Sequence, residues 1–166
     1  MKDDQNFMNH ALAEARCAIM EGNWPIGAVV VLNNKIIAKA HNEVFTNKCK
    51  IDHAELIALK QCQDKLLKHP NQATLYTTYE PCPMCFGACV LSKIKRVVSS
   101  LNIENSGAMY LKDHLPKLFT QDKYNIEFTH GVLAKECYKV FIQGDPVKKL
   151  IERKAVDEKL LKELDV

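Results

Sequence analysis

The feature that most constrains this chain is a set of candidate metal ligands in two segments that lie far apart in the sequence. His53 is followed two positions later by Glu55, and residues 81–85 read Pro-Cys-Pro-Met-Cys. One histidine and two cysteines are ligands that zinc accepts, and three protein ligands leave a fourth position for water, as catalytic zinc sites do. The fold therefore has to bring these two segments together around one ion.

The size and composition of the chain are those of one globular domain with its own core. It has 166 residues, of which 47% are hydrophobic and 26% charged. No apolar run approaches the roughly 18 residues of a membrane helix, and acidic residues stand near the N-terminus where a signal peptide needs basic ones. We therefore expect a cytoplasmic protein without a membrane partner. The net charge of +3 permits an anionic partner but does not argue for one.

The cysteine content favours thiols and metal ligands over disulfides. The chain has seven cysteines, an odd number that does not form the even framework of a small secreted scaffold. Those outside residues 81–85 are expected to be inert thiols on apolar helix faces, apart from Cys49, which falls in a predicted loop.

Alternating patterns of apolar residues predict a succession of helices and strands. Helical spacing covers about 4–21, and the strands 26–32 and 35–40 flank Asn33-Asn34, which is typical of a β-hairpin. The remaining pattern predicts helices at about 52–68, 84–91 and 133–141 and strands at 73–79, 94–99 and 126–130. This order indicates an α/β fold whose mixed sheet is covered on both faces, with the hairpin as an antiparallel edge.

The C-terminal third of the chain is less regular. Residues 101–123 fit neither periodicity and are expected to be mostly loop with a short helix. Pro146 opens a charged helix that extends to about residue 164. Six basic and six acidic residues between Asp145 and Asp165 form a balanced face, typical of solvent exposure rather than of nucleic-acid binding. No linker or repeat divides the chain, so residues 1–166 are expected to form a single domain.

The candidate ligands fall at the starts of two predicted helices. Asp52 is a plausible N-cap for the helix that carries His53 and Glu55, and Cys82 and Cys85 begin the next helix. Helix N-termini favour thiolates because they carry partial positive charge and free N–H groups. Zinc held there would lower the pKa of a bound water from 15.7 to roughly 7, and Glu55 would be close enough to move the proton to a leaving group.

These motifs, taken in order, resemble those of the cytidine deaminase-like superfamily, in its branch of guanine, guanosine and tRNA adenosine deaminases. An H-x-E motif followed by P-C-x-x-C is the signature of zinc deaminases, and the ordered set is far more specific than a lone Cys-x-x-Cys. The resemblance covers most of the chain and includes residues 25–30, 41–42, 53–55, 74–88 and 94–98. It implies a three-layer α/β/α fold with a five-stranded mixed sheet, a single CMP/dCMP-type deaminase domain, and assembly as a homodimer.

The resemblance also implies a role for each motif residue. His53, Cys82 and Cys85 would hold Zn²⁺, and Glu55 would be the catalytic proton shuttle of an aminohydrolase. The reaction would remove the exocyclic amino group of a nucleobase or nucleoside and release ammonia.

Further residues would contact the substrate or order the site. Asn42 would hydrogen-bond the base or sugar, and Ala28 belongs to a backbone segment that lines the base pocket. Glu80-Pro81 would order the ligand loop. Trp24, directly before Pro25, could stack on a base, although a packed or interface tryptophan is as consistent with the sequence.

The choice of substrate depends on loops where this chain departs from its relatives. Residues 49–52 read Cys-Lys-Ile-Asp where many relatives have Asp-Pro-Thr-Ala, and Asn102 and Ile103 replace an arginine–aspartate pair of bacterial tRNA adenosine deaminases. Both loops touch nucleic acid in that branch. Their different residues in this chain therefore favour a small-molecule purine substrate of the guanine or guanosine type. The alternative is a tRNA-specific adenosine deaminase that makes inosine at the wobble position, and residues 126–133 resemble those enzymes more closely.

Two non-catalytic readings stay open. In a zinc-stabilised binding module, Cys89 would be the nearest candidate for a fourth ligand, but Glu55 would then have no purpose. An inactive interaction subunit with the deaminase fold is disfavoured by the intact motifs. Structural or surface roles are favoured for His41, His114 and His130, and the role of Tyr79 is undecided.

Overall fold

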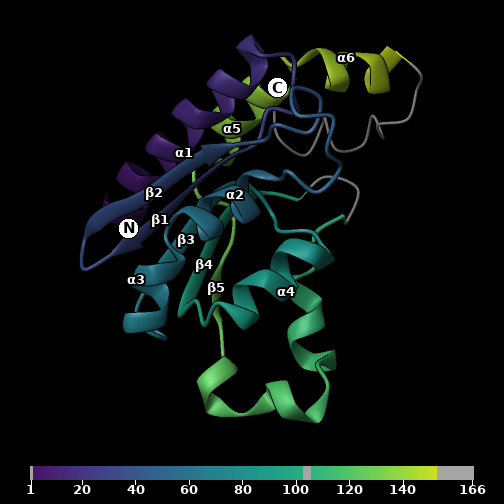
Figure 1. The fold of residues 1–166 in the computed structure, drawn as a ribbon. Coiled ribbons are helices and arrows are strands. Elements are labelled where there is room, and N and C mark those ends of the chain that lie inside the picture. The colour runs from purple at the N-terminus through teal and green to yellow at the C-terminus, as the bar shows by residue number, and fades with distance from the viewer. Residues whose placement is uncertain (1, 103–105, 153–166) are drawn as a thin grey trace.

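Five strands form one mixed sheet in the computed structural model, which describes residues 2–102 and 106–152 (Figure 1). The strands are β1 (Gly27–Leu32), β2 (Lys35–His41), β3 (Thr74–Tyr79), β4 (Arg96–Leu101) and β5 (Glu127–Thr129). They lie in the order β2-β1-β3-β4-β5. β1 is antiparallel to β2 and β3, whereas β3, β4 and β5 are parallel to one another. The predicted mixed sheet with an antiparallel hairpin at its edge is confirmed.

Helices cover both faces of this sheet (Figure 1). They are α1 (Lys2–Met20), α2 (Ala54–Gln61), α3 (Gln63–Lys68), α4 (Pro83–Leu91), α5 (Ala134–Phe141) and α6 (Asp145–Glu152). Residues of α1 and α5 share an apolar core with one face of the sheet, and residues of α2 and α4 share a second core with the other face. The three-layer α/β/α architecture is therefore as predicted.

The sequence of β1 shows why the two cores form. Val29 and Val31 belong to the core that contains α1 and α5, whereas Ala28, Val30 and Leu32 belong to the core that contains α2 and α4. Successive side chains of a strand point to opposite faces, so a strand covered on both sides needs an apolar residue at every position. The unbroken apolar run of β1 meets this requirement at the centre of the fold.

A two-residue turn joins β1 to β2. Asn33 and Asn34 have φ angles of 50° and 58°, in the left-handed region that asparagine tolerates better than most residues. Leu32 pairs with Lys35 directly across the turn. Two consecutive positive φ angles are the requirement of the commonest hairpin turn, which explains the Asn-Asn pair.

The helix predicted over residues 52–68 differs from the observed one at both its start and its middle. It is divided into α2 and α3 at Cys62, whose φ and ψ of −119° and 14° are not helical. The prediction that Asp52 is the N-cap was wrong, because His53 occupies that position in an extended conformation. The Asp52 carboxylate accepts a hydrogen bond from the side chain of Asn47 at 2.9 Å, so it serves the preceding loop.

Residues 106–126 contain short 3-10 helices instead of one short α-helix. These are η2 (Met109–His114), η3 (Lys117–Thr120) and η4 (Asp122–Tyr124). Residues 153–166, which include the end of the predicted charged helix, lie outside the described residues, as does Ile103. Within the described ranges, no helix has both the length and the apolar content needed to cross a membrane.

Candidate metal centre and base pocket

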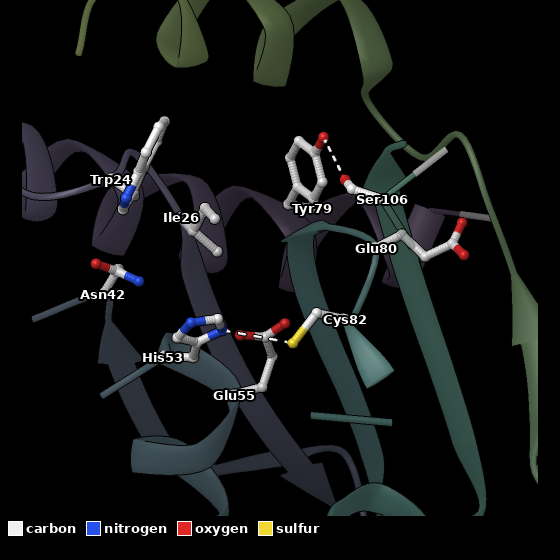
Figure 2. Close-up of a pocket in the computed structure, with 9 residues that line it drawn as sticks. All are labelled: Trp24, Ile26, Asn42, His53, Glu55, Tyr79, Glu80, Cys82 and Ser106. Carbon is white, nitrogen blue, oxygen red and sulfur yellow. Dashed lines mark hydrogen bonds between the residues drawn. The ribbon is translucent and has the colours of Figure 1, made fainter. Parts of the chain in front are cut away.

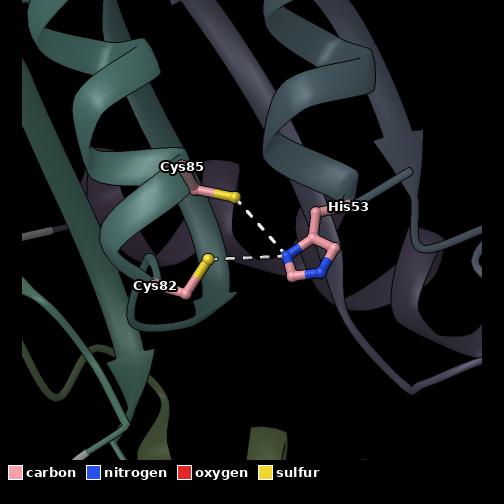
Figure 3. Close-up of side chains that lie close together, drawn as sticks. All are labelled: His53, Cys82 and Cys85. Carbon is pink, nitrogen blue, oxygen red and sulfur yellow. Dashed lines mark hydrogen bonds between the residues drawn. The ribbon is translucent and has the colours of Figure 1, made fainter. Parts of the chain in front are cut away.

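Two chain segments converge at the end of β3. Strand β3 ends at Tyr79, and the chain passes through Glu80 and Pro81 to Cys82, the N-cap of α4. His53 is the N-cap of the neighbouring helix α2, and its side chain points toward the start of α4 (Figure 3). The two motif segments, 29 residues apart from His53 to Cys82, thus meet at two helix N-termini.

The side chains of His53, Cys82 and Cys85 have the spacing of ligands around one zinc ion. His53 Nδ1 lies 3.6 Å from Cys82 Sγ and 3.5 Å from Cys85 Sγ (Figure 3). Ligands bound tetrahedrally at zinc–nitrogen and zinc–sulfur distances of 2.0–2.3 Å would lie about 3.6 Å apart. The donor types and the distances therefore both fit zinc.

The same group of residues offers three protein ligands and no fourth. Among the described His, Cys, Asp and Glu side chains, the group of three or more whose ligand atoms all lie within 4.8 Å of one another consists of His53, Cys82 and Cys85. Cys89, one helical turn beyond Cys85, is fully buried and is not part of this group. An open fourth position distinguishes a catalytic zinc site from a structural one.

Hydrogen bonds within the cluster favour a thiolate at Cys82. A hydrogen bond from the Cys85 thiol is the largest of the effects that lower the pKa of Cys82 to about 4. The same hydrogen bond, together with burial, raises the pKa of Cys85. The hydrogen bond with Cys82 also raises the pKa of His53, and the backbone of Lys50 contributes in the same direction. A backbone carbonyl near a ligating imidazole is a suitable outer partner for its second nitrogen.

Glu55 lies beside the cluster without belonging to it. Its side chain is 3% exposed, and it lines the same cavity as His53 and Cys82 (Figure 2). Burial is the main cause that raises the pKa of the Glu55 carboxyl to about 7. A carboxyl that exchanges its proton near neutral pH and borders a metal site has the properties of a general acid–base catalyst.

A small cavity opens above the candidate metal centre. Its volume is about 190 Å³, below the 300–1,000 Å³ that is typical of pockets for drug-sized ligands. It is lined by Trp24, Ile26, Asn42, His53, Glu55, Tyr79, Glu80, Cys82 and Ser106. His53, Glu55 and Cys82 lie together at one end, and Trp24 and Tyr79 lie on opposite sides of the other end (Figure 2). A ligand of nucleobase size fits these dimensions better than a larger one.

Asn42 supplies a polar group to the cavity wall. It is 1% exposed, and its Oδ1 accepts a hydrogen bond from the backbone N–H of Val44 at 3.2 Å. This contact identifies the carbonyl side of the amide and directs the NH₂ group toward the cavity (Figure 2). The amide can therefore donate a hydrogen bond to a ligand inside.

Of four other residues considered from the sequence, one lines the cavity and three lie elsewhere. Trp24 lines the cavity, whereas Ala28 is fully buried in the core shared with α2 and α4, and Ile26 is the lining residue of that segment. His41 lies within 3.3 Å of Glu14 on α1 and of Glu21 directly after that helix, and it does not line the cavity. His114 is exposed on η2.

Glu80 is buried and acts on a segment that the sequence did not connect to the site. Its carboxylate accepts the backbone N–H of Met109 at 3.0 Å and lies 3.6 Å from His130 Nδ1. A Cβ atom at Gly107 would collide with this carboxylate, so glycine at this position allows the close contact. The contact brings Ser106 to the cavity wall, where it lies 3.0 Å from the Tyr79 hydroxyl (Figure 2).

Comparisons with known proteins agree with this description. A family model for the cytidine and deoxycytidylate deaminase zinc-binding region matches residues 1–101. A tRNA-specific adenosine deaminase of Bacillus subtilis is 39% identical over 140 residues, which cover 82% of this chain and 85% of that protein. A structure from studies of A-to-I editing by tRNA:A34 deaminases at the wobble position of transfer RNA is 29% identical, with a TM-score of 0.68, covering 81% of this chain and 98% of the other.

Guanine deaminases share the same fold. The crystal structure of guanine deaminase from Bacillus subtilis is 34% identical, with a TM-score of 0.52, and the match covers 57% of this chain and 62% of the other. The resemblance to the deaminase branch, the fold and the zinc chemistry are confirmed. The preference for a free purine is less well supported than its alternative, a tRNA-specific adenosine deaminase.

Proposed function

This chain belongs to the cytidine and deoxycytidylate deaminase family and is a zinc-dependent deaminase, and from that premise we propose that its substrate is the wobble adenosine of a tRNA. The observation that carries the proposal is the extent of similarity to tRNA-specific adenosine deaminases, which covers 82% of this chain in one match and 98% in another. The product is inosine. Assembly as a homodimer and a cytoplasmic location are further parts of this proposal.

The metal ligands in this proposal are His53, Cys82 and Cys85. Zinc bound by them supplies a Lewis acid that makes water nucleophilic at neutral pH. The Lys50 carbonyl holds the His53 ring in position, and the start of α4 stabilises the thiolate of Cys82. These contacts exist before the substrate enters.

Glu55 moves the proton in this proposal. Its carboxyl lies at the floor of the cavity between His53 and Cys82, where it can accept a proton from the attacking water (Figure 2). A C–O bond forms at the amino-bearing ring carbon, the C–N bond breaks, and Glu55 delivers the proton to the nitrogen that leaves as ammonia. The Glu55 carboxyl is itself nearly fully buried, which limits its contact with bulk water.

Asn42 and Trp24 orient the base in this proposal. The NH₂ group of Asn42 donates a hydrogen bond to an acceptor nitrogen of the purine ring, since its carbonyl is already engaged by Val44. The Trp24 ring covers one side of the cavity opposite Tyr79 (Figure 2). These contacts place the amino group of adenine toward Glu55.

A comparison of substrates tests the proposal. Zinc-loaded protein is incubated with an RNA hairpin that presents an anticodon loop with adenosine at the wobble position, and separately with guanine, guanosine, adenosine and cytosine. We expect inosine in the hairpin, with much slower ammonia release from the free compounds. Rapid ammonia release from guanine or guanosine without inosine formation in RNA would overturn the proposal and support the free-purine alternative.

A further inference from the structure

Two aromatic rings extend the cavity outward onto the molecular surface. Trp24 lines the cavity, and the ring of Phe45 lies against it with a centroid distance of 6.4 Å and an interplanar angle of 30°. Phe45 does not line the cavity and is 50% exposed. A single exposed apolar side chain is ordinary on a protein surface. Here, however, the exposed ring continues directly from the wall of the pocket, and the two rings form an aromatic step.

The backbone beneath Phe45 is held by buried hydrogen bonds. Asn23 is 0% exposed, and its Oδ1 accepts the backbone N–H groups of Phe45 at 2.8 Å and Thr46 at 3.1 Å. Its Nδ2 donates to Thr46 Oγ1 at 2.6 Å. The position of Phe45 is thus set by Asn23 and does not depend on burying its own ring. A surface ring held in this way loses little conformational freedom when a ligand covers it.

The geometry suits an unpaired nucleotide beside the target base. The cavity of about 190 Å³ accommodates a base but not its neighbours. An enzyme that draws one base of a nucleic acid into a pocket separates it from the adjacent bases, which lose their stacking partners. An aromatic side chain at the pocket entrance replaces that stacking in a sequence-tolerant way. A free purine has no neighbouring base to place on Phe45.

We propose that the step formed by Trp24 and Phe45 binds the unpaired nucleotide next to the target adenosine by stacking. This inference rests on the proposed function, since it requires a nucleic-acid substrate. The loop that carries Phe45 has a balanced charge, with Glu43 and Asp52 against Lys48 and Lys50. The contribution of the step is therefore expected to depend weakly on salt, unlike binding to phosphates.

Binding measurements with abasic RNA test the proposal. Trp24 is the only tryptophan in the chain, so its fluorescence reports on the pocket entrance. Zinc-loaded Glu55→Gln protein, which binds without turnover, is titrated with the anticodon hairpin and with two hairpins in which the 5′ or the 3′ neighbour of the adenosine is abasic. We expect one abasic replacement to weaken binding about tenfold. In the double variant that carries both Glu55→Gln and Phe45→Ala, the same abasic replacement should change the affinity less than twofold, because the two changes remove one shared contact.

Two further variants serve as controls. Phe45→Tyr keeps an aromatic ring and should retain the tenfold penalty. Leu67→Ala removes another exposed apolar side chain, 77% exposed on α3, and should also leave the penalty unchanged.

Three outcomes would overturn the proposal. If the abasic penalty is absent, or is equally large with Phe45→Ala, the step does not bind the neighbouring nucleotide, although inosine formation can still support the proposed function. If Phe45→Ala changes the oligomeric state in light scattering and leaves the penalty intact, the step is a contact between copies of the chain. If no hairpin is bound or deaminated while free purines are, the proposed function fails as well.

Discussion

The floor and the rim of the base pocket are held in place in different ways. The floor, with His53, Glu55 and Cys82, is built on the starts of α2 and α4, which pack against the sheet. At the rim, Trp24 and Ser106 line the cavity. The loop that packs on Trp24 through Phe45 and the segment 106–109 have backbones held by single buried side chains, Asn23 and Glu80. Regular structure thus positions the groups that react, and individual hydrogen bonds position the groups that meet the substrate.

This difference makes opposite predictions for the two regions. Changes in the floor should affect metal binding or the chemical step, because those groups touch the reacting atoms. Changes in the rim should mainly affect substrate affinity, because they displace walls of the cavity while the floor stays on its helices. A rim variant that lost its metal, or a floor variant that changed only KM, would contradict this division.

The largest effect is expected from the comparison of Cys85→Ala with Cys89→Ala. Both thiols are fully buried on α4, but only Cys85 belongs to the ligand group. Cys85→Ala should lose zinc and all measurable activity, because two protein ligands rarely retain the ion against a chelator. Cys89→Ala should keep stoichiometric zinc and cost about 1 kcal/mol of stability. Metal analysis by mass spectrometry after dialysis distinguishes the two variants. Zinc loss in Cys89→Ala would instead support a structural zinc site with Cys89 as its fourth ligand.

A loss of turnover with retained zinc is expected for Glu55→Gln. The amide is similar in shape but cannot carry the proton, and general acid–base groups contribute about 10²–10⁴-fold to rates. The variant should therefore show a fall of this size in kcat with unchanged zinc content and substrate affinity. Loss of the ion from Glu55→Gln would instead make Glu55 a ligand and contradict its role as a proton carrier.

The floor could be predicted from the sequence because its chemistry depends on residue type and spacing. Only a few residue types bind zinc, and prolines at 81 and 83 mark the passage from a strand into a helix. The periodicity of the strands was sufficient to place both motifs at one edge of the sheet. The N-cap was misassigned to Asp52 because Asn47, in the same loop, competes for its carboxylate.

The rim could not be predicted because its contacts are non-local. Ser106 reaches the cavity only through the buried contact of Glu80 with Gly107 and Met109, 27 to 29 residues further along the chain. No local pattern in residues 101–123 indicates that contact. The substrate preference drawn from residues 49–52 and from Asn102 compared loop residue types alone, and the geometry of those loops was not available from the sequence.

A moderate effect is expected from Gly107→Ala, with Gly87→Ala as its control. A methyl group at 107 would collide with the Glu80 carboxylate and displace the segment that carries Ser106. We expect KM to rise about tenfold with kcat nearly unchanged, and stability to fall by about 1–3 kcal/mol, as for other overpacked sites. At Gly87, inside α4, a Cβ atom meets nothing within 4 Å, so Ala should leave KM unchanged and slightly raise the melting temperature. Equal KM values for both variants would show that residues 106–109 do not shape the pocket.

The smallest effect on activity is expected from Asp4→Ala, which lies away from the base pocket. Asp4 accepts hydrogen bonds from the Arg96 guanidinium at 2.8 and 3.1 Å and from the Tyr76 hydroxyl at 2.9 Å. The Asp4 and Arg96 side chains are 15% and 27% exposed. Asp4→Ala should therefore lower the free energy of unfolding by about 1–3 kcal/mol at neutral pH, the range for hydrogen bonds to charged groups. Neither kcat nor KM should change, since none of these residues lines the base pocket.

The pH dependence of the Asp4 effect follows from the sign of its pKa shift. The hydrogen bond from Arg96 lowers the pKa of Asp4 from its ordinary value of 3.8. A carboxyl with a lowered pKa in the folded state stabilises the fold above its unfolded pKa, and this stabilisation is lost as the pH falls through the folded value. Urea unfolding should accordingly show a difference between wild type and Asp4→Ala that is full at pH 7 and shrinks below about pH 3.8. Asp113→Ala, an exposed carboxylate 4.0 Å from Lys112, should differ from wild type by less than about 0.5 kcal/mol at both pH values. A pH-independent loss at Asp4 would mean that packing, and not its charge, joins α1 to the sheet.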